Sequence, residues 1–324
     1  AKNFIDLFAG IGGFHLAIHD DEWNCVYASE NDKYARETYK KNFEDISPSI
    51  FNNQLFNDDI LKANPKEIPT HNLLCAGFPC QPFSQAGYKK GFSEKLEDRG
   101  NMFFVIRDII AKKRPDAIFL ENVRHLMNHD NGRTFIIIKD ILENELDYKI
   151  SHKIIKASDY GLPQHRPRIF IIGFPKEHRY PFPFTFPEPQ ELKLTMSDIW
   201  GGKCDRKIGF TLRVGGRGSN IDDRRNWDSY RVDGNVVRLE VEQGKKMMGL
   251  PANFQFPVPK TQAMKQLGNS VAVNAVRAVS NEIKGRRSSS NFKKTLLNIT
   301  EEGAIFKSYI DGSNHLLSPE KSIQ

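Results

Sequence analysis

One cysteine of this sequence stands where a nucleophile could be presented, between two prolines and directly after a short apolar run. The segment Gly77-Phe78-Pro79-Cys80-Gln81-Pro82-Phe83-Ser84 follows residues 73–76, which have the composition of a buried strand. Proline fixes its own backbone φ angle, so the loop that carries Cys80 is expected to be stiff. A stiff loop holding a thiol suits nucleophilic chemistry, although a buried cysteine in a turn is an equally good interpretation of this segment alone.

Acidic and basic side chains stand beside two further apolar runs. Glu121-Asn122-Val123 follows residues 117–120, and Gln164-His165-Arg166-Pro167-Arg168 precedes residues 169–173. A carboxyl group can donate or accept a proton, and guanidinium groups stabilise negative charge that develops on a substrate oxygen. Paired arginines before a strand are also typical of a solvated sheet edge, so the pattern alone leaves both interpretations open.

A glycine-rich turn indicates a nucleotide-binding site. In Asp6-Leu7-Phe8-Ala9-Gly10-Ile11-Gly12-Gly13-Phe14, a strand is expected to end at Phe8 and a helix to begin near Gly13. Glycines allow positive φ angles and let a ligand approach the backbone closely. Glu30 stands about 20 residues further on, which suits an acid that binds ribose hydroxyls. The spacing is neither a dinucleotide fingerprint nor a P-loop, and a plain strand–turn–helix is the alternative.

These segments need a fold that brings strand ends together. Six apolar runs are expected to form strands, at residues 3–8, 25–30, 73–76, 117–121, 149–155 and 168–174. Helical spacing of apolar residues covers 101–113, 134–146 and 262–284. Strands that alternate with helices predict an α/β fold, a doubly wound and mostly parallel sheet with helices on both faces. Such sheets bind ligands at the carboxyl ends of their strands.

The chain is expected to contain two domains and a tail. Residues 1–175 carry most of the motifs, and four prolines within 181–189 predict an extended linker after them. Residues 176–260 are expected to form a smaller, loop-rich domain, since residues 201–234 are rich in glycine, arginine, aspartate and asparagine. The tail, residues 285–324, shows no strong core pattern and has no assigned role.

Composition excludes several classes of protein. The chain of 324 residues has no apolar stretch near the ~18 residues of a membrane span and no recognisable signal peptide. Its four cysteines are too few for a disulfide scaffold and lack paired zinc spacing, so a reducing cytoplasm is expected. The net charge of +7 hints at a polyanionic partner, and nine basic but only six acidic residues lie between Lys203 and Glu240.

Together the motifs are far more specific than any one of them. Residues 6–14, 77–84, 121–123, 164–168 and 268–271 occur in the order and approximate spacing seen in bacterial cytosine-5 DNA methyltransferases, the modification enzymes of type II restriction–modification systems. The sequence strongly resembles that family. The resemblance implies S-adenosyl-L-methionine as methyl donor, S-adenosyl-L-homocysteine as product, no metal, and double-stranded DNA with a flipped-out cytosine as substrate. It also implies a monomer that protects DNA from a cognate restriction endonuclease, with target recognition in 176–260 and a helix at 261–284 that returns to the catalytic domain.

The resemblance assigns roles to residues. Cys80 adds to cytosine C6 so that C5 becomes nucleophilic, which requires a lowered thiol pKa. Glu121 shares a proton with N3, which requires a raised carboxyl pKa, and Arg168, supported by Arg166, faces O2. The implied cofactor site consists of Phe8, Gly10, Ile11, Gly12, Gly13, Glu30, Asp59, Ile60, Pro79, Asn269 and Ser270. The implied DNA contacts are Gln81, Ser84, Lys89, Arg99, Thr211, Arg213, Arg217, Arg224 and Arg225. The loop 84–99 is expected to close over the flipped base.

Two alternatives stay open at this point. An RNA (tRNA) cytosine-5 methyltransferase would share the chemistry of Cys80, although Gln81-Pro82-Phe83-Ser84 follows the DNA-type pattern. A non-catalytic DNA-binding relative would not need Cys80, Glu121, Arg166 and Arg168 all to be intact. A nicotinamide dehydrogenase on a similar sheet does not explain Cys80 and Glu121 together.

Overall fold

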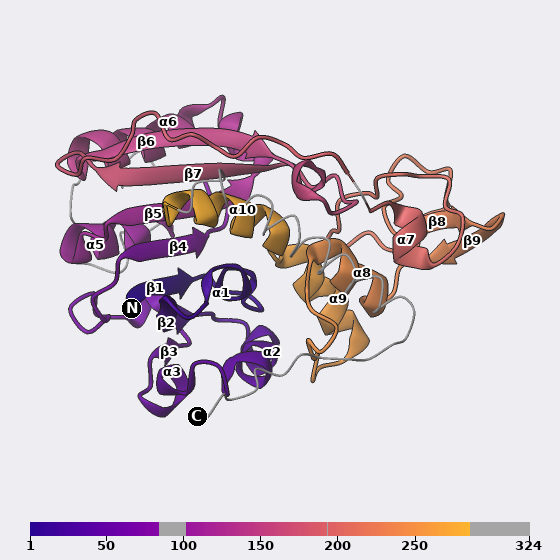
Figure 1. Cartoon of the computed structure of the whole chain (residues 1–324), viewed down its shortest axis with the longest axis horizontal. Coiled ribbons are helices and arrows are strands. Elements are labelled where there is room, and N and C mark those ends of the chain that lie inside the picture. Colours follow the sequence, from indigo (N-terminus) through magenta and orange to yellow (C-terminus); the bar gives the residue numbers. More distant parts are fainter. Residues whose placement is uncertain (84–101, 193, 286–324) are drawn as a thin grey trace, which may run out of the picture.

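A computed structural model describes residues 1–83, 102–192 and 194–285 (Figure 1). The predicted α/β architecture is confirmed, with a seven-stranded sheet in the order β3-β2-β1-β4-β5-β7-β6. Its strands are β1 (Lys2–Leu7), β2 (Trp23–Ser29), β3 (Phe56–Asn57), β4 (Leu73–Gly77), β5 (Ala117–Val123), β6 (Tyr148–Ile155) and β7 (Arg168–Pro175). Six of them match the predicted runs within two residues, and the two-residue β3 is too short to leave a pattern in the sequence.

The sheet is parallel from β3 to β5, whereas β7 runs antiparallel to both of its neighbours. No α-helix crosses over in the fully described segment between β6 and β7, and a connection without a crossover favours an antiparallel neighbour. This reversal places the first residue of β7, Arg168, at the edge where β5 ends with Val123. An arginine at the start of a strand therefore reaches the edge at which ligands bind.

Two apolar cores lie on opposite faces of the sheet. Consecutive strand residues alternate between them, so that Phe4 and Cys75 enter one core while Ile5 and Leu74 enter the other. The first core is shared with α1 (Gly13–Ile18), α2 (Lys33–Phe43) and α10 (Val273–Ile283). The second is shared with α5 (Phe103–Lys113) and α6 (Arg133–Asp140). Burial on both faces explains why the strands read as continuous apolar runs.

The segment expected to be one helix at 262–284 is two helices, α9 (Lys260–Asn269) and α10. Ser270 has an extended backbone (φ −76°, ψ 165°), which ends the helical hydrogen bonding of α9. The chain then continues in a new direction, and α10 packs against α1. The Arg277 and Lys284 side chains donate to the carbonyls of Leu16 and Ile18, so the end of the described chain is tied to α1. No helix of the described residues has the length and apolar character that crossing a membrane needs.

The smaller unit lies at one end of the molecule (Figure 1) and contains α7 (Met196–Trp200), β8 (Ser229–Val232) and β9 (Asn235–Arg238). The strands form a hairpin whose turn, Asp233-Gly234, has positive φ angles at both residues (50° and 82°). Such a turn matches the twist of the two strands. α8 (Val241–Met248) and α9 lie between this unit and the sheet (Figure 1). Residues 176–260, the segment predicted to recognise DNA, include this unit and α8; we call this segment the reader domain.

Candidate active site

Most of the predicted catalytic and cofactor-binding residues lie along one edge of the sheet. This edge is formed by the carboxyl ends of β1, β2, β4 and β5 together with the start of β7, because all four of those strands are parallel and β7 is reversed. Phe8 follows β1, Glu30 follows β2, and Glu121 lies near the end of β5. The arrangement is the one expected for ligand binding in an open α/β sheet.

The glycine-rich turn is bound to the acid after β2. The backbone N–H of Gly10 donates to Oε2 of Glu30 over 2.7 Å, and the N–H of Asp32 donates to Oε1 over 3.0 Å. Phe8 and Gly10 both have positive φ angles, 54° and 55°. A left-handed phenylalanine is costly and persists where surrounding contacts impose it, as at ligand sites. The two hydrogen bonds therefore hold the turn in shape beside a carboxylate.

The three glycines of this turn, Gly10, Gly12 and Gly13, differ in what surrounds the position of an added side chain. A Cβ atom added at Gly12 would lie 2.2 Å from Cε2 of Phe43, and one at Gly13 would lie 2.5 Å from Cγ2 of Val271. A Cβ at Gly10 would meet no atom within 4 Å among the described residues. Gly12 and Gly13 are thus needed for packing, whereas Gly10 faces open space beside Glu30. Of the three glycines, Gly10 is therefore the one that leaves room for another molecule.

Substituting alanine at these glycines is expected to separate packing from ligand binding. Gly12→Ala should lower the free energy of unfolding by about 1–3 kcal/mol, because the new methyl group overlaps the buried Phe43 ring. Gly10→Ala should cost only about 1 kcal/mol for the left-handed backbone but should weaken S-adenosyl-L-methionine binding. Thermal melts and calorimetric titration measure both quantities. Equal loss of stability in the two variants would contradict this assignment.

The segment after α9 completes the floor of this site. Ser270 is buried, and its Oγ would lie 3.3 Å from a Cβ atom at Gly13, while Asn269 is exposed. Ile60 is buried in the second core, and the Asp59 carboxylate accepts from the N–H of Leu61 over 3.1 Å. The structure therefore brings Ser270 to the glycine turn from the far end of the described chain.

The cysteine loop is held by the neighbouring strand. Nδ2 of Asn122 donates to the carbonyl of Phe78 over 2.9 Å, which ties the loop to β5. Oε1 of Gln81 accepts from the N–H of Met102 over 3.0 Å, and Pro79 is exposed. Asn122 was not among the predicted site residues. Its place in the motif Glu121-Asn122-Val123 was the sequence signal that could have identified it. The loop is thus stiffened by a side-chain hydrogen bond as well as by its prolines.

The pKa of Cys80 differs from the expectation. The thiol is partly buried, and burial raises its pKa instead of lowering it. Among the described residues, no cation lowers the pKa of this thiol enough to cancel the effect of burial. The predicted DNA-contact residues Ser84, Lys89 and Arg99, and the closing loop they belong to, lie outside the described residues.

Glu121 and Arg168 form an ion pair at the centre of the edge. Nε of Arg168 lies 3.2 Å from Oε1 of Glu121, and both side chains are largely buried. Burial raises the pKa of Glu121, and the positive charges of Arg168 and Arg166 act in the opposite direction. A carboxyl group with a raised pKa is the one that a proton donor needs. The cysteine loop is adjacent, since a Cβ atom at Gly77 would lie 3.4 Å from Oε2 of Glu121.

Arg166 binds backbone carbonyls of two other parts of the chain. Its Nη1 donates to the carbonyl of Leu212 over 3.1 Å, and its Nη2 donates to the carbonyls of Gly268 (2.8 Å) and Ser270. The side chain is buried, which lowers its pKa, and its backbone has a positive φ angle of 33°. Arg166 therefore joins β7 to the reader domain and to the end of α9. Its guanidinium thus contacts the backbone that surrounds the site and, among the described residues, makes no hydrogen bond to Glu121.

The predicted DNA-reading residues are in different environments. Oγ1 of Thr211 accepts from the backbone N–H of Arg166 over 3.0 Å. Nε of Arg217 lies 3.3 Å from Oδ2 of the buried Asp228, and Arg225 forms a two-point ion pair with Asp223. Arg217 is therefore held within the reader domain by a buried carboxylate. The other three predicted arginines are exposed: Arg213, Arg224 and Arg225.

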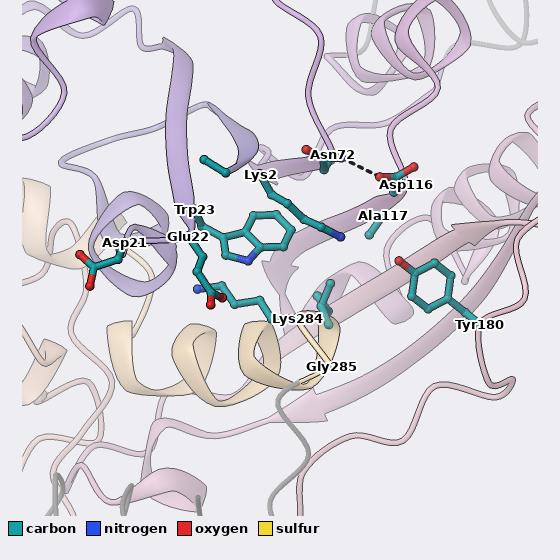
Figure 2. A pocket seen from close by; sticks show the side chains of 12 residues that line it. Lys2, Asp21, Glu22, Trp23, Asn72, Asp116, Ala117, Tyr180, Lys284 and Gly285 are labelled. Atoms are coloured by element: carbon teal, nitrogen blue, oxygen red, sulfur yellow. Dashed lines mark hydrogen bonds between the residues drawn. The ribbon is translucent and has the colours of Figure 1, made fainter.

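A cavity of about 390 Å³ lies at the opposite edge of the sheet (Figure 2). Lys2, Trp23 and Ala117, which line it, are at the amino ends of β1, β2 and β5. Nδ2 of Asn72 donates to Oδ2 of Asp116 at its wall. Because the cavity is at the amino ends of the strands, it is separate from the candidate active site.

The strand order with the reversed β7, the glycine turn beside an acid and the cysteine loop define the class of S-adenosyl-L-methionine-dependent methyltransferases. The sequence model of C-5 cytosine-specific DNA methylases matches residues 2–213 and 208–285. The chain belongs to this family.

Individual relatives agree with this assignment. The chain is 40% identical to Type II methyltransferase M.SsoII of Shigella sonnei over 315 residues, 86% of this chain and 79% of that protein. It is 35% identical to Type II methyltransferase M.HhaI of Haemophilus parahaemolyticus over 329 residues, 90% of this chain and 95% of that protein. The fold is also that of a putative prophage DNA modification methyltransferase from E. coli, with a TM-score of 0.65, 20% identity and coverage of 88% of this chain and 99% of that one.

Proposed function

We propose that this protein methylates C5 of a flipped-out cytosine within a specific short sequence of double-stranded DNA. The observation that carries the proposal is the meeting of three groups at one sheet edge. The cysteine loop is tied to β5 by the 2.9 Å hydrogen bond from Asn122, and Glu121 on the same strand is paired with Arg168 at 3.2 Å. A nucleophile, a carboxyl with a raised pKa and a fixed cation are the groups that addition to a pyrimidine ring needs.

Each group has a defined step. The sulfur of Cys80 forms a bond to C6, and the electron pair of the C5–C6 double bond forms a C4–C5 double bond. The pair of the C4–N3 double bond moves onto N3, from where its charge is shared with O2. Glu121 gives its proton to N3 while Arg168 stabilises the charge on O2, so that C5 becomes nucleophilic. After C5 has gained its methyl group, C5 loses its proton and the C5–C6 double bond re-forms. Cys80 then leaves as thiolate, and the proton on N3 returns to Glu121. Since burial raises the pKa of Cys80 in the free chain, activation of the thiol belongs to the DNA-bound state.

The glycine turn fits S-adenosyl-L-methionine, which supplies an electrophilic methyl group when bound. Gly10 leaves open space above the turn, and the Glu30 carboxylate beside it is held by the N–H groups of Gly10 and Asp32. Such a carboxylate can accept hydrogen bonds from ribose hydroxyls. Phe8, Asp59 and Ser270 border the same turn or the neighbouring strand end and would complete the pocket. No residue of the pocket needs a metal for this role.

Catalysis and recognition are both within one chain, so we propose that it acts as a monomer in the cytoplasm. The names of its relatives as Type II methyltransferases support a role in restriction–modification, in which methylation protects DNA from a cognate endonuclease. The base that removes the C5 proton is not among the groups assigned above, and a water molecule can serve.

Bisulfite sequencing of DNA and RNA from bacteria that express the protein tests this function. We expect unconverted cytosines at one position of one recurrent short DNA sequence, and none in cells that express Cys80→Ala. Unconverted cytosine confined to transfer RNA would overturn the DNA assignment and favour an RNA methyltransferase. Full conversion of both nucleic acids, with the protein folded and expressed, would overturn the activity itself.

A further inference from the structure

The reader domain contains a buried carboxylate that binds one exposed loop. We call residues 213–220 the recognition loop; Arg213, Val214 and Gly215 in it are exposed. Asp228 has no exposed surface, and its two carboxylate oxygens lie 3.3–3.4 Å from the N–H of Gly218. Oδ2 of Asp228 is also 3.3 Å from Nε of Arg217. Asp228 therefore binds the loop at two consecutive residues.

Arg238, the last residue of β9, also binds the carboxylate of Asp228. Nη1 of Arg238 lies 3.4 Å from Oδ1 of Asp228, and its Nη2 donates to the carbonyl of Gly218 over 3.3 Å. Nη2 of Arg217 donates to the carbonyl of Leu239 over 2.7 Å. The donors from loop and hairpin thus converge on one carboxylate. Desolvation offsets much of the attraction in a buried ion pair. The main effect of this cluster is therefore to fix the orientation of the recognition loop.

A second hydrogen bond, from Trp227, holds the recognition loop at Gly215. Nε1 of the buried Trp227 donates to the carbonyl of Gly215 over 2.9 Å. A Cβ atom added at Gly215 or Gly218 would meet nothing within 4 Å among the described residues. The loop is consequently held from its inner side by Trp227 and Asp228, while its outer side is open.

The base of the recognition loop is joined to the active-site edge. The carbonyl of Leu212 accepts from Arg166, and Gly268 packs so closely that a Cβ there would lie 2.4 Å from the carbonyl oxygen of Arg213. Arg166 is two residues from Arg168, which pairs with Glu121. The open side of the loop thus begins beside the groups that would act on the cytosine.

We propose that Asp228 is a positioning residue that presets the recognition loop for reading base edges of duplex DNA, so that sequence choice depends on its carboxylate. The proposal rests on the proposed function. The exposed Arg213 at the start of the loop carries the planar donor group that pairs with two guanine acceptors in the major groove. Such pairing needs a fixed approach, which a loop bound at Gly215, Arg217 and Gly218 provides.

The test uses Asp228→Asn, which keeps the shape of the side chain and removes its charge. We expect the ratio of kcat/KM on the methylated sequence to kcat/KM on duplexes with one changed base pair to fall at least about tenfold, the size of one lost two-point base contact. The KM for S-adenosyl-L-methionine should stay unchanged. The control is Asp222→Asn, which removes an exposed carboxylate that pairs with Arg231 at 3.5 Å and should leave the ratio within about twofold.

The outcomes separate positioning from simple support of the fold. Loss of rate on all duplexes by the same factor, or an unchanged ratio in a folded Asp228→Asn protein, would overturn the proposal. If Asp228→Asn does not fold, Trp227→Phe decides, because it removes the hydrogen bond to Gly215 and should lower the same ratio; an unchanged ratio overturns the proposal. Failure of the wild type to methylate DNA would instead overturn the proposed function.

Discussion

Replacing Cys80 with serine is expected to abolish methyl transfer, with a loss of at least about 10³-fold in rate, and to prevent a covalent complex with DNA. A hydroxyl group is a far weaker nucleophile than a thiol, and no other described cysteine lies in the loop after β4. The measurement is incubation with S-adenosyl-L-methionine and a duplex that has 5-fluorocytosine at the target position. The fluorine cannot leave as a proton does, so the wild-type adduct survives denaturing electrophoresis.

Cys204 provides the matched control for this experiment. It is a free, partly buried cysteine whose pKa is also raised by burial, and it lies in the reader domain. Cys204→Ser should therefore form the adduct at the wild-type rate. A stable adduct in the Cys80→Ser protein would show that Cys80 is not the nucleophile.

Glu121→Gln should lower kcat/KM for DNA by about 10²–10⁴-fold and change its pH dependence. Burial raises the pKa of both groups, and the ordinary pKa of a thiol is about four units above that of a carboxyl group, so we expect Cys80 to titrate at the higher pH. In the proposed mechanism the active form has Cys80 ionised and Glu121 protonated. In the wild type the rate should therefore rise up to the pKa of Glu121, stay level, and fall above the pKa of Cys80. Glutamine has no ionisation, so the rate of the variant should keep rising with pH up to the pKa of Cys80.

Glu177→Gln is the control for Glu121→Gln. Glu177 also forms an ion pair with an arginine, 3.0 Å from Nη2 of Arg114, but its side chain is exposed and lies just beyond the end of β7, away from the active-site edge. Activity and pH profile should stay those of the wild type. If Glu121→Gln keeps the level region of the wild-type profile, Glu121 is not the proton donor.

The sheet and the active-site edge were predictable because each is encoded locally. Strands buried on both faces leave continuous apolar runs, and the residues that follow those runs, such as Glu30 and Glu121, must lie at one edge of a parallel sheet. The hairpin of β8 and β9 was not predicted, although Asp-Gly, here Asp233-Gly234, is a strong signal for a two-residue hairpin turn.

Other features depend on contacts between residues far apart in the chain. The pKa of Cys80 is set by burial that no local pattern reports, and the partner of Arg217 is a carboxylate 11 residues away with no periodic relation to it. The division of 262–284 into two helices depends on Ser270, whose extended backbone is held by the Arg166 side chain 104 residues earlier. Such tertiary contacts override local helical spacing.

The contacts of Arg166 have a consequence for how new DNA specificities arise. On the reader side its guanidinium binds the main-chain carbonyl of Leu212, and the backbone of His165 likewise donates to the carbonyl of Gly209 over 2.9 Å. Every amino acid supplies a carbonyl, so these attachments survive substitutions of most side chains on the reader side. Under the proposed function, one reader domain can therefore replace another at this junction while the catalytic chemistry stays the same, and hybrid enzymes joined there should inherit the specificity of the donor of the reader.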